Sequence, residues 1–190
     1  MNPVLRHPPE LLLKAQGSAF GMKAVIFDVD GVLTDGRIYI GEAGEIFKAF
    51  NTLDGHGLKS LQSVGIEPLI ITGRDAPAVR RRVADLGLTH ALFGIKDKLA
   101  AATPLLAQLG IDWADVAAMG DDWPDLPLMT RAGLAIAPPG AHPEVLALAD
   151  YVTQRPAGYG AAREACDLLL LAAGHYGRLF EAHCQTLDGQ

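Results

Sequence analysis

The sequence has few cysteines and no excess of positive charge. Only two of its 190 residues are cysteine, Cys166 and Cys184, and they lack the spacing of a metal-binding cluster. We therefore expect reduced thiols in a cytoplasmic protein, with a disulfide as the less favoured alternative. Acidic residues outnumber lysine and arginine by 22 to 16, which gives a formal net charge of −6. That balance argues against a sequence-independent nucleic-acid surface.

Long apolar runs and internal divisions are also missing. The leucine run at residues 11–13 is flanked by charged residues and is too short for a signal peptide. The apolar stretch at 168–173 is far below the length that spans a bilayer. We expect a soluble protein with no membrane partner. No repeat, linker or low-complexity tract divides the chain, and a composition that is 49% hydrophobic and 20% charged suits one compact domain, residues 1–190.

One stretch, residues 23–36, joins an apolar run to carboxylates: KAVIFDVDGVLTDG. Ala24–Phe27 is typical of a parallel strand buried on both faces, and Asp28 follows it directly. Asp30 lies two residues further on, so in an extended chain both carboxylates point to the same side. The carboxyl end of such a strand is where open α/β sheets bind ligands. Taken alone, the D-x-D-G pattern is equally compatible with a functional site and with an ordinary turn.

Strand and helix patterns alternate along the rest of the chain. We expect further strands at residues 67–72, 91–93, 116–119, 134–137 and 151–153, and helices at 9–15, 54–65, 76–86, 98–109, 143–149 and 161–173, with a short helix after Asp122. Arg37–Ile40 and Glu45–Phe50 flank a glycine-containing turn and predict a β-hairpin. Residues 174–190 are interpreted as a tail. This alternation predicts an α/β fold, a three-layer Rossmann-like parallel sheet with a β-hairpin insertion.

Polar residues recur where the strands are expected to end. They are Asp28 and Asp30 after the first strand, Thr72 after the second, Asp121, Asp122 and Asp125 after the fourth, and Lys98 at the start of the preceding helix. In one cleft, several carboxylates raise one another's pKa unless a cation is present. Hard oxygen ligands with few protein donors favour Mg²⁺. Thr72 and Lys98 supply a hydroxyl and a positive charge, both suited to phosphoryl oxygens.

The chemistry that fits this set is phosphoryl transfer to a carboxylate. Asp28 is expected to attack phosphorus in line and form an aspartyl-phosphate. Asp30 is expected to protonate the leaving alcohol and then to deprotonate the water that hydrolyses the intermediate. Mg²⁺, Lys98 and Thr72 are expected to neutralise charge on the equatorial oxygens.

The chain resembles the haloacid dehalogenase superfamily of phosphatases, whose four motifs occur here in order. They are Asp28-Val-Asp30-Gly-Val-Leu-Thr34, Thr72, Lys98 and Gly120-Asp121-Asp122-x-x-Asp125. The resemblance implies that Asp28 is the nucleophile and Asp30 the acid/base. It also implies Mg²⁺ bound by Asp28, the Asp30 carbonyl and Asp121, with Asp122 and Asp125 in support. Four motifs in the correct order make coincidence improbable.

Within that superfamily the chain is most similar to the 3-deoxy-D-manno-octulosonate 8-phosphate phosphatases. The matching stretches include residues 28–36, 51–57, 71–74, 120–122, 141–143, 149–153 and 160–168. The resemblance implies Mg-dependent hydrolysis of that sugar-acid phosphate in lipopolysaccharide precursor synthesis. It also implies a fold without a cap domain, and a homotetramer in which the hairpin, residues 38–50, builds a central barrel and a neighbouring subunit closes the site. Thr72, Gly73, Arg74 and Lys98 are the implied substrate-binding residues. The chain departs from the family at Tyr159, where a basic residue is frequent.

Other interpretations of the whole chain stay open at this point. The substrate could be another sugar-acid phosphate, such as a nine-carbon 9-phosphate, or the specificity could be broad. A signalling receiver domain also combines Asp, Thr, Lys and Mg²⁺, but its phosphorylated Asp comes from a later strand than its acidic pair, whereas Asp28 and Asp30 follow one strand. A catalytically silent assembly subunit is unsupported, because every expected catalytic residue type is present.

Several individual residues also have a structural interpretation. Asp35 is favoured as a turn residue, Asp122 is equally compatible with a helix N-cap and with a role in the metal shell, and Asp125 could be only a cap. Lys98 is favoured over Lys96 for the phosphate because it directly follows a capping Asp97. Four further cases remain. His56 is expected at the solvent or an interface, His142 at a helix start, and Arg155 and Arg163 are equally surface or substrate residues. Trp113 and Trp123 are expected to pack, although Trp123 lies within the acidic loop and could instead line the pocket.

Overall fold

The computed structural model describes residue 5, residues 7–18 and residues 21–185. Its strands are β1 (Ala24–Phe27), β2 (Tyr39–Gly41), β3 (Gly44–Phe47), β4 (Glu67–Ile71), β5 (His90–Leu92), β6 (Val116–Met119), β7 (Leu134–Ala137) and β8 (Tyr151–Val152). Its helices are α1 (Pro9–Ala15), α2 (Thr52–Gln62), α3 (Pro77–Leu86), α4 (Lys98–Leu109), α5 (Leu126–Arg131), α6 (Pro143–Leu148), α7 (Ala161–Ala172) and α8 (Tyr176–Gln185), with 3-10 turns at Trp113–Asp115 and Trp123–Asp125. Within these described ranges, no helix has the length and hydrophobicity needed to cross a membrane.

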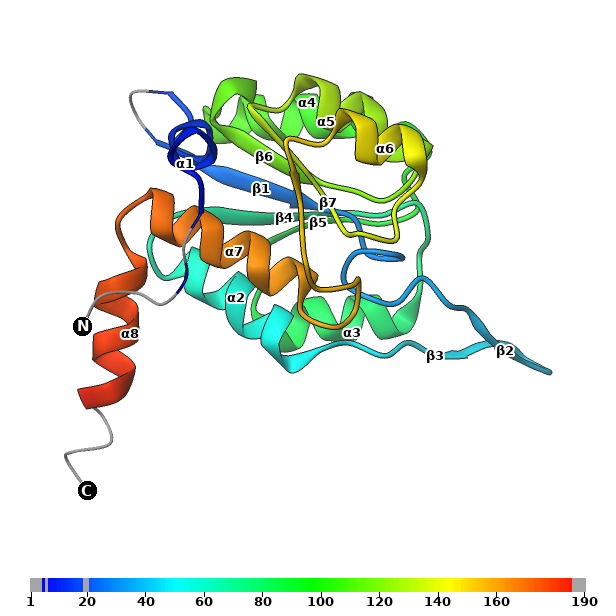
Figure 1. Ribbon diagram of the computed structural model, residues 1–190. Helices are drawn as coiled ribbons and strands as arrows, with labels where there is room; N and C mark the ends of the chain where they lie inside the picture. The colour runs from blue at the N-terminus through cyan, green and yellow to red at the C-terminus, as the bar shows by residue number, and fades with distance from the viewer. Residues whose placement is uncertain (1–4, 6, 19–20, 186–190) are drawn as a thin grey trace.

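A six-stranded parallel sheet runs through the centre of the molecule, in the order β5-β4-β1-β6-β7-β8 (Figure 1). The strand order reverses at β1, because β4 and β5 lie on one side of it and β6, β7 and β8 on the other. Ligands of open α/β sheets bind at such a reversal, outside the carboxyl ends of the strands. The loops after β1 and β6 therefore occupy the position where a site is expected.

The side chains of β1 explain why helices cover both faces of the sheet. All four residues of this strand are at most 1% exposed. Val25 and Phe27 pack with α2 and α7, whereas Ala24 and Ile26 pack with α4, α5 and α6. Figure 1 shows the same division, with α4, α5 and α6 over one face and α2, α3 and α7 over the other. The predicted three-layer arrangement is thus confirmed.

The predicted hairpin is present and extends beyond the carboxyl edge of the sheet (Figure 1). Its strands, β2 and β3, are antiparallel and shorter than the sequence indicates, with a register shift between Tyr39 and Ile40. The rings of Tyr39 and Phe47 stack with centroids 4.4 Å apart. Residues 28–51, which connect β1 to α2, hold no other strand or helix. The expectation that no cap domain is inserted here is therefore met.

Helix α2 begins earlier than predicted and also caps α7. It begins at Thr52 because the Asn51 side chain accepts a hydrogen bond from the Leu53 N–H at 2.9 Å. The buried Asp54 carboxylate accepts the Arg163 N–H at 2.8 Å, in the first turn of α7. Because the first N–H groups of a helix have no partner within it, this bond ties α2 to the start of α7.

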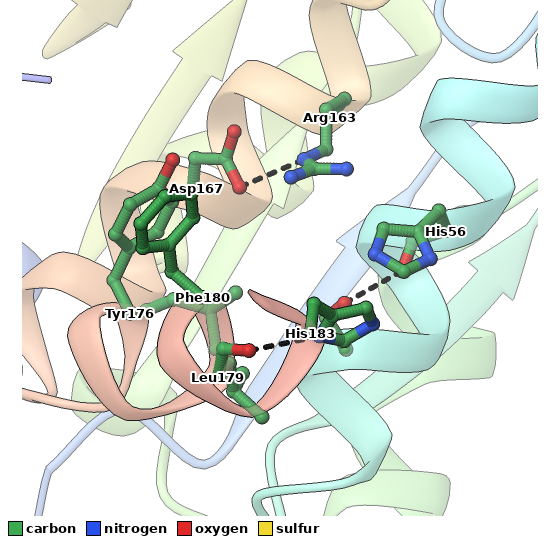
Figure 2. A pocket seen from close by; sticks show the side chains of 9 residues that line it. His56, Arg163, Asp167, Tyr176, Leu179, Phe180 and His183 are labelled. Carbon is green, nitrogen blue, oxygen red and sulfur yellow. Dashed lines mark hydrogen bonds and ion pairs between the residues drawn. The ribbon is translucent and has the colours of Figure 1, made fainter. Parts of the chain in front are cut away.

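The interpretation of residues 174–190 as a tail is wrong for residues 176–185, which form α8; residues 186–190 lie outside the described part. Hydrophobic side chains of α8 pack against the core face that carries α7. A cavity of about 210 Å³ lies between α2, α7 and α8 (Figure 2). Its lining includes His56 from α2, the Arg163–Asp167 ion pair from α7, and Phe180 and His183 from α8.

The contact between α8 and α2 is expected to weaken in acid. The rings of His56 and His183 meet edge to face, with centroids 5.3 Å apart. Burial and then the positive charge of Arg163 lower the pKa of His56 from its ordinary value of 6.5; His183 and Lys59 act in the same direction and Asp167 opposes them. Because the unfolded chain binds this proton more readily, the stabilisation is present above about pH 6.5 and is lost as the pH falls through the folded pKa.

We therefore expect amide hydrogen exchange in residues 176–185 to rise roughly threefold relative to the rest of the chain between about pH 7.5 and pH 5.5, after correction for intrinsic exchange. His56→Gln should remove most of this rise. His90→Gln, on the distant strand β5, is the matched control and should retain it. Equal pH dependence in both variants would contradict the role of His56.

Candidate active site

Three carboxylates and one lysine meet at the carboxyl ends of β1 and β6. Asp28 follows β1, and its N–H donates to the Met119 carbonyl of β6 at 3.1 Å. Lys98 is 4% exposed and donates to Asp28 Oδ1 and to Asp125 Oδ1, at 2.6 Å each. One carboxylate oxygen each of Asp28, Asp121 and Asp125 lie within 4.8 Å of one another. The structure therefore brings residues from three separate parts of the sequence into one cluster.

This cluster holds more negative charge than Lys98 neutralises. Burial, followed by the nearby Asp28, Asp125 and Asp122, raises the pKa of Asp121 to about 7. Burial and Asp125 raise the pKa of Asp28 to about 6, although Lys98 opposes them. Burial lowers the pKa of Lys98, but Asp28 and Asp125 outweigh that effect and leave the pKa raised. A bound cation would relieve this excess of negative charge.

The residues at this edge fit a hard divalent cation. Asp121 approaches the loop after β1 so closely that a Cβ at Gly31 would lie 2.0 Å from its Oδ2, and Gly31 also has φ +94°. Asp125 already accepts two hydrogen bonds at Oδ2, from the N–H groups of Asp121 and Asp122 at 3.1 and 3.4 Å. Asp28 and Asp121 are therefore the better placed to bind Mg²⁺, with Asp125 orienting the loop that carries Asp121.

Binding of Mg²⁺ at this cluster should stabilise the fold. A ligand at a hundredfold excess over its Kd raises the free energy of unfolding by about 2.7 kcal/mol when it binds only the folded state. We expect a shift of that size in denaturant unfolding of the wild-type protein, and little shift in Asp121→Asn. Asp122→Asn is the matched control, because an amide also caps a helix, and it should respond like wild type. An equal response of Asp121→Asn and wild type would place the ion elsewhere.

Asp30 lies in a second group of charges that includes two residues of the hairpin segment. Its Oδ1 accepts a hydrogen bond from the Lys48 ammonium, and Lys48 also pairs with Glu45 at 2.9 Å. Arg74 donates to Glu45 at 2.7 Å and lies 3.6 Å from Asp30 Oδ2. Glu45 and Lys48 were not predicted from the sequence as site residues. In the sequence they are only two charged residues within an expected strand. That pattern is equally typical of a strand edge that faces solvent.

Thr72, Gly73 and Arg74 follow β4, beside β1, at the same edge of the sheet. Thr72 is 1% exposed, and its hydroxyl accepts the Arg74 N–H at 3.4 Å. Among the described residues, no hydrogen bond or ion pair connects Thr72 directly to the carboxylate cluster. Arg74 lines an open groove of about 420 Å³, together with Glu45, Phe47 and Pro77. The groove lies between the hairpin and the start of α3, and Asp28, Asp30 and Lys98 are not among its lining residues.

Several residues with two sequence interpretations have structural roles. Asp35 accepts the Arg37 N–H at 3.0 Å in a turn. Asp122 is the N-cap of the turn that contains Asp125, and His142 is the N-cap of α6. Lys96 is exposed, in contrast to Lys98.

The two arginines left open lie outside the carboxylate cluster. Arg163 pairs with Asp167 on its own helix, and the Arg155 N–H donates to Glu164. Tyr159 and Trp123 are 57% and 61% exposed. Next to Tyr159, Gly158 packs so tightly on the loop after β1 that a Cβ would lie 2.6 Å from a backbone nitrogen.

Sequence comparisons place this arrangement among known hydrolases. A sequence profile of the haloacid dehalogenase-like hydrolases matches residues 94–164. The chain is 48% identical over 169 residues to 3-deoxy-D-manno-octulosonate 8-phosphate phosphatase KdsC of Escherichia coli strain K12, an alignment that covers 89% of this chain and 88% of the relative.

Solved structures agree with the sequence comparison. The 3-deoxy-D-manno-octulosonate 8-phosphate phosphatase of Moraxella catarrhalis, in complex with a magnesium ion, a phosphate ion and a KDO molecule, superposes with a TM-score of 0.87 at 38% identity. That match covers 93% of this chain and 99% of the other. The corresponding phosphatase of Yersinia pestis superposes with a TM-score of 0.84 at 43% identity, covering 89% of each chain.

Proposed function

Because the chain belongs to the haloacid dehalogenase-like hydrolases, and within them to the 3-deoxy-D-manno-octulosonate 8-phosphate phosphatases, we propose that it hydrolyses this sugar-acid phosphate to the free sugar acid and phosphate with Mg²⁺ as cofactor. The observation that carries the proposal is the convergence of Asp28, Asp121 and Lys98 at the strand-order reversal. An anionic substrate at an acidic edge needs such a lysine and a cation.

The protein side chains have separable roles in the proposed reaction. Asp28 Oδ attacks phosphorus while the bond from phosphorus to the sugar oxygen breaks, and Asp30 gives its proton to that oxygen. In the second step Asp30 takes a proton from water, the water oxygen bonds to phosphorus, and Asp28 is released. Lys98 holds the Asp28 carboxylate in place and, with Thr72, neutralises phosphoryl oxygens.

Asp28 and Asp121 are the side chains that would hold the metal ion. When bound, Mg²⁺ neutralises charge on the phosphoryl group and on the crowded carboxylates. Arg74 is the residue that we assign to the substrate's carboxylate, because its Nε lies 3.6 Å from Asp30 Oδ2 and 44% of its side chain is exposed.

A substrate panel tests this proposal. Phosphate release should require Mg²⁺, and kcat/KM should be at least about tenfold higher for 3-deoxy-D-manno-octulosonate 8-phosphate than for a nine-carbon sugar-acid 9-phosphate. Arabinose 5-phosphate, which lacks a carboxylate, is the control for the contribution of that group. Equal rates across the panel would instead indicate a broad-specificity phosphatase, and a preference for the nine-carbon compound would indicate the alternative substrate.

We further propose that the protein is a homotetramer assembled through the hairpin, with a neighbouring subunit closing the active site. Apolar side chains are exposed along the hairpin segment, at Ile38, Ile40, Ile46 and Phe47. A concentration of this kind is typical of a protein interface. The exposure of Arg74, 44% of its side chain, gives the second reason, because the single subunit does not enclose this residue.

Light scattering at micromolar concentration should give four times the chain mass. Ile46→Asp, at a side chain that is 65% exposed, should reduce the assembly to smaller species without unfolding the subunit. Leu13→Asp is the matched control, because Leu13 on α1 is 66% exposed and lies outside the hairpin. A wild-type monomer, or equal effects of the two variants, would contradict assembly through the hairpin.

Three further proposals follow from family membership. We propose that residues 1–190 act as one domain, which the packing of helices on both faces of one sheet supports. We propose a cytoplasmic location, which the two free cysteines support. We also propose that the product enters lipopolysaccharide precursor synthesis.

A further inference from the structure

The acid/base of the proposed reaction belongs to a cluster of four charged residues. It consists of Asp30, Glu45, Lys48 and Arg74, and we call it the hairpin charge cluster. Two of its members, Glu45 and Lys48, belong to the segment 44–48 that returns from the hairpin tip toward α2. The hairpin therefore does more than present an apolar surface, because it carries charged groups back to the acid at position 30.

Lys48 is the most deeply buried member of this cluster. Its side chain is 1% exposed, whereas those of Asp30, Glu45 and Arg74 are 19%, 16% and 44% exposed. Burying an ammonium group is costly unless it is paired, and Lys48 has two carboxylate partners, Asp30 Oδ1 and Glu45 Oε1. A lysine that served only to attach the hairpin would not need to contact the catalytic acid.

The two oxygens of Asp30 differ in their surroundings. Oδ1 accepts hydrogen bonds from the Lys48 ammonium and, at 3.4 Å, from the Thr34 hydroxyl. Oδ2 is buried and has no hydrogen-bond partner among the described residues, although Arg74 Nε lies 3.6 Å away. One oxygen is thus anchored by hydrogen bonds, whereas the other has only the longer contact with Arg74 and its capacity to accept a hydrogen bond is unused.

We propose that Lys48 is a positioning residue that orients the carboxyl group of Asp30, so that Oδ2 exchanges the proton with the leaving group and with water. This inference rests on the proposed function, because it assumes the acid/base role of Asp30. Lys48 touches no reacting atom in this arrangement and acts only through Asp30. Loss of Lys48 should therefore slow the reaction most for substrates whose leaving group must be protonated as it departs.

Leaving groups of different basicity test the proposal. The phenolate of phenyl phosphate is strongly basic and needs protonation, whereas p-nitrophenolate leaves as a stable anion. Because both substrates lack a carboxylate, the contact of Arg74 with that group does not affect the comparison. The quantity to measure is kcat/KM, since it reports the step that releases the alcohol. In Lys48→Met we expect kcat/KM for phenyl phosphate and for the sugar-acid phosphate to fall about 10- to 100-fold, with much less change for p-nitrophenyl phosphate.

Two further variants separate positioning from a structural role. Lys48→Arg keeps a cation beside Oδ1 and should restore most of the ratio between phenyl and p-nitrophenyl phosphate. Lys59→Met, at an exposed lysine of α2, is the matched control and should match wild type. An equal loss on all substrates, or no loss on any, would overturn the proposal. If the wild-type protein hydrolyses aryl phosphates but not the sugar-acid phosphate, the proposed substrate fails while the aryl pair still decides the role of Lys48.

Discussion

Replacing Asp28 by Asn should abolish Mg-dependent phosphatase activity, with a loss of roughly 10⁴-fold or more. The amide oxygen is a poor nucleophile and cannot form the aspartyl-phosphate, and no neighbouring carboxylate has the same position at the end of β1. Asp121 and Asp125 lie close by but follow β6, and Asp125 is already bonded to Lys98 and to two backbone N–H groups. Phosphate release under saturating substrate measures the effect.

The same substitution should leave the fold intact. The Asp28 N–H bond to Met119 is a backbone interaction, and Lys98 keeps Asp125 as a partner. Because burial and Asp125 raise the pKa of Asp28 to about 6, the charge at this position is held at a cost to stability. We therefore expect the unfolding free energy of Asp28→Asn without Mg²⁺ to stay within about 1 kcal/mol of wild type.

Asp35→Asn is the matched control for the loss of activity. Asp35 lies in the same loop as Asp28, but its carboxylate accepts the Arg37 N–H in a turn, which an amide oxygen can also do. This variant should retain wild-type turnover. Turnover near wild type in Asp28→Asn would remove Asp28 from the proposed role, and an equal loss in Asp35→Asn would point to a disturbed loop.

The sequence predicts the sheet well because each strand is a short apolar run whose position in the sequence is unambiguous. Ala24–Phe27 must be buried on both faces, and the parallel α/β layout then brings Asp28, Asp121 and Lys98 to one edge. This convergence follows from strand order alone, so that the cluster is predictable without coordinates. Roles of individual residues within it remain predictions.

Tertiary contacts between segments that lie far apart in the sequence could not be predicted. Half of residues 176–185 are hydrophobic, but the segment is short, and α8 is stabilised because one side of it packs on α7. Lys48 is a charged residue next to a strand, and only the return of the hairpin brings it to Asp30. The earlier start of α2 depends on one hydrogen bond, which the Leu53 N–H donates to the Asn51 side chain.

Lys98→Met should lower both activity and stability, since Lys98 is the only cation that the described structure bonds to Asp28 and Asp125. Lys98 is the first residue of α4, where a positive charge is unfavourable to the helix, and its two carboxylate partners compensate for that position. Removing one partner of a buried ion pair costs about 3 kcal/mol, because the remaining charges stay buried. We expect that loss in denaturant unfolding, together with a fall in kcat of about 10²- to 10³-fold.

Magnesium should restore part of the stability of Lys98→Met but little of its activity. A divalent ion bound by Asp28 and Asp121 can take the place of Lys98 as the counter-charge of this cluster, so the variant should gain more unfolding free energy from Mg²⁺ than wild type does. It cannot replace the ammonium group as a donor to the phosphoryl oxygens. Lys96→Met, at an exposed lysine two residues earlier, should change neither property. If Lys98→Met and Lys96→Met unfold at the same denaturant concentration without Mg²⁺, then the buried carboxylates do not depend on Lys98 for their stability.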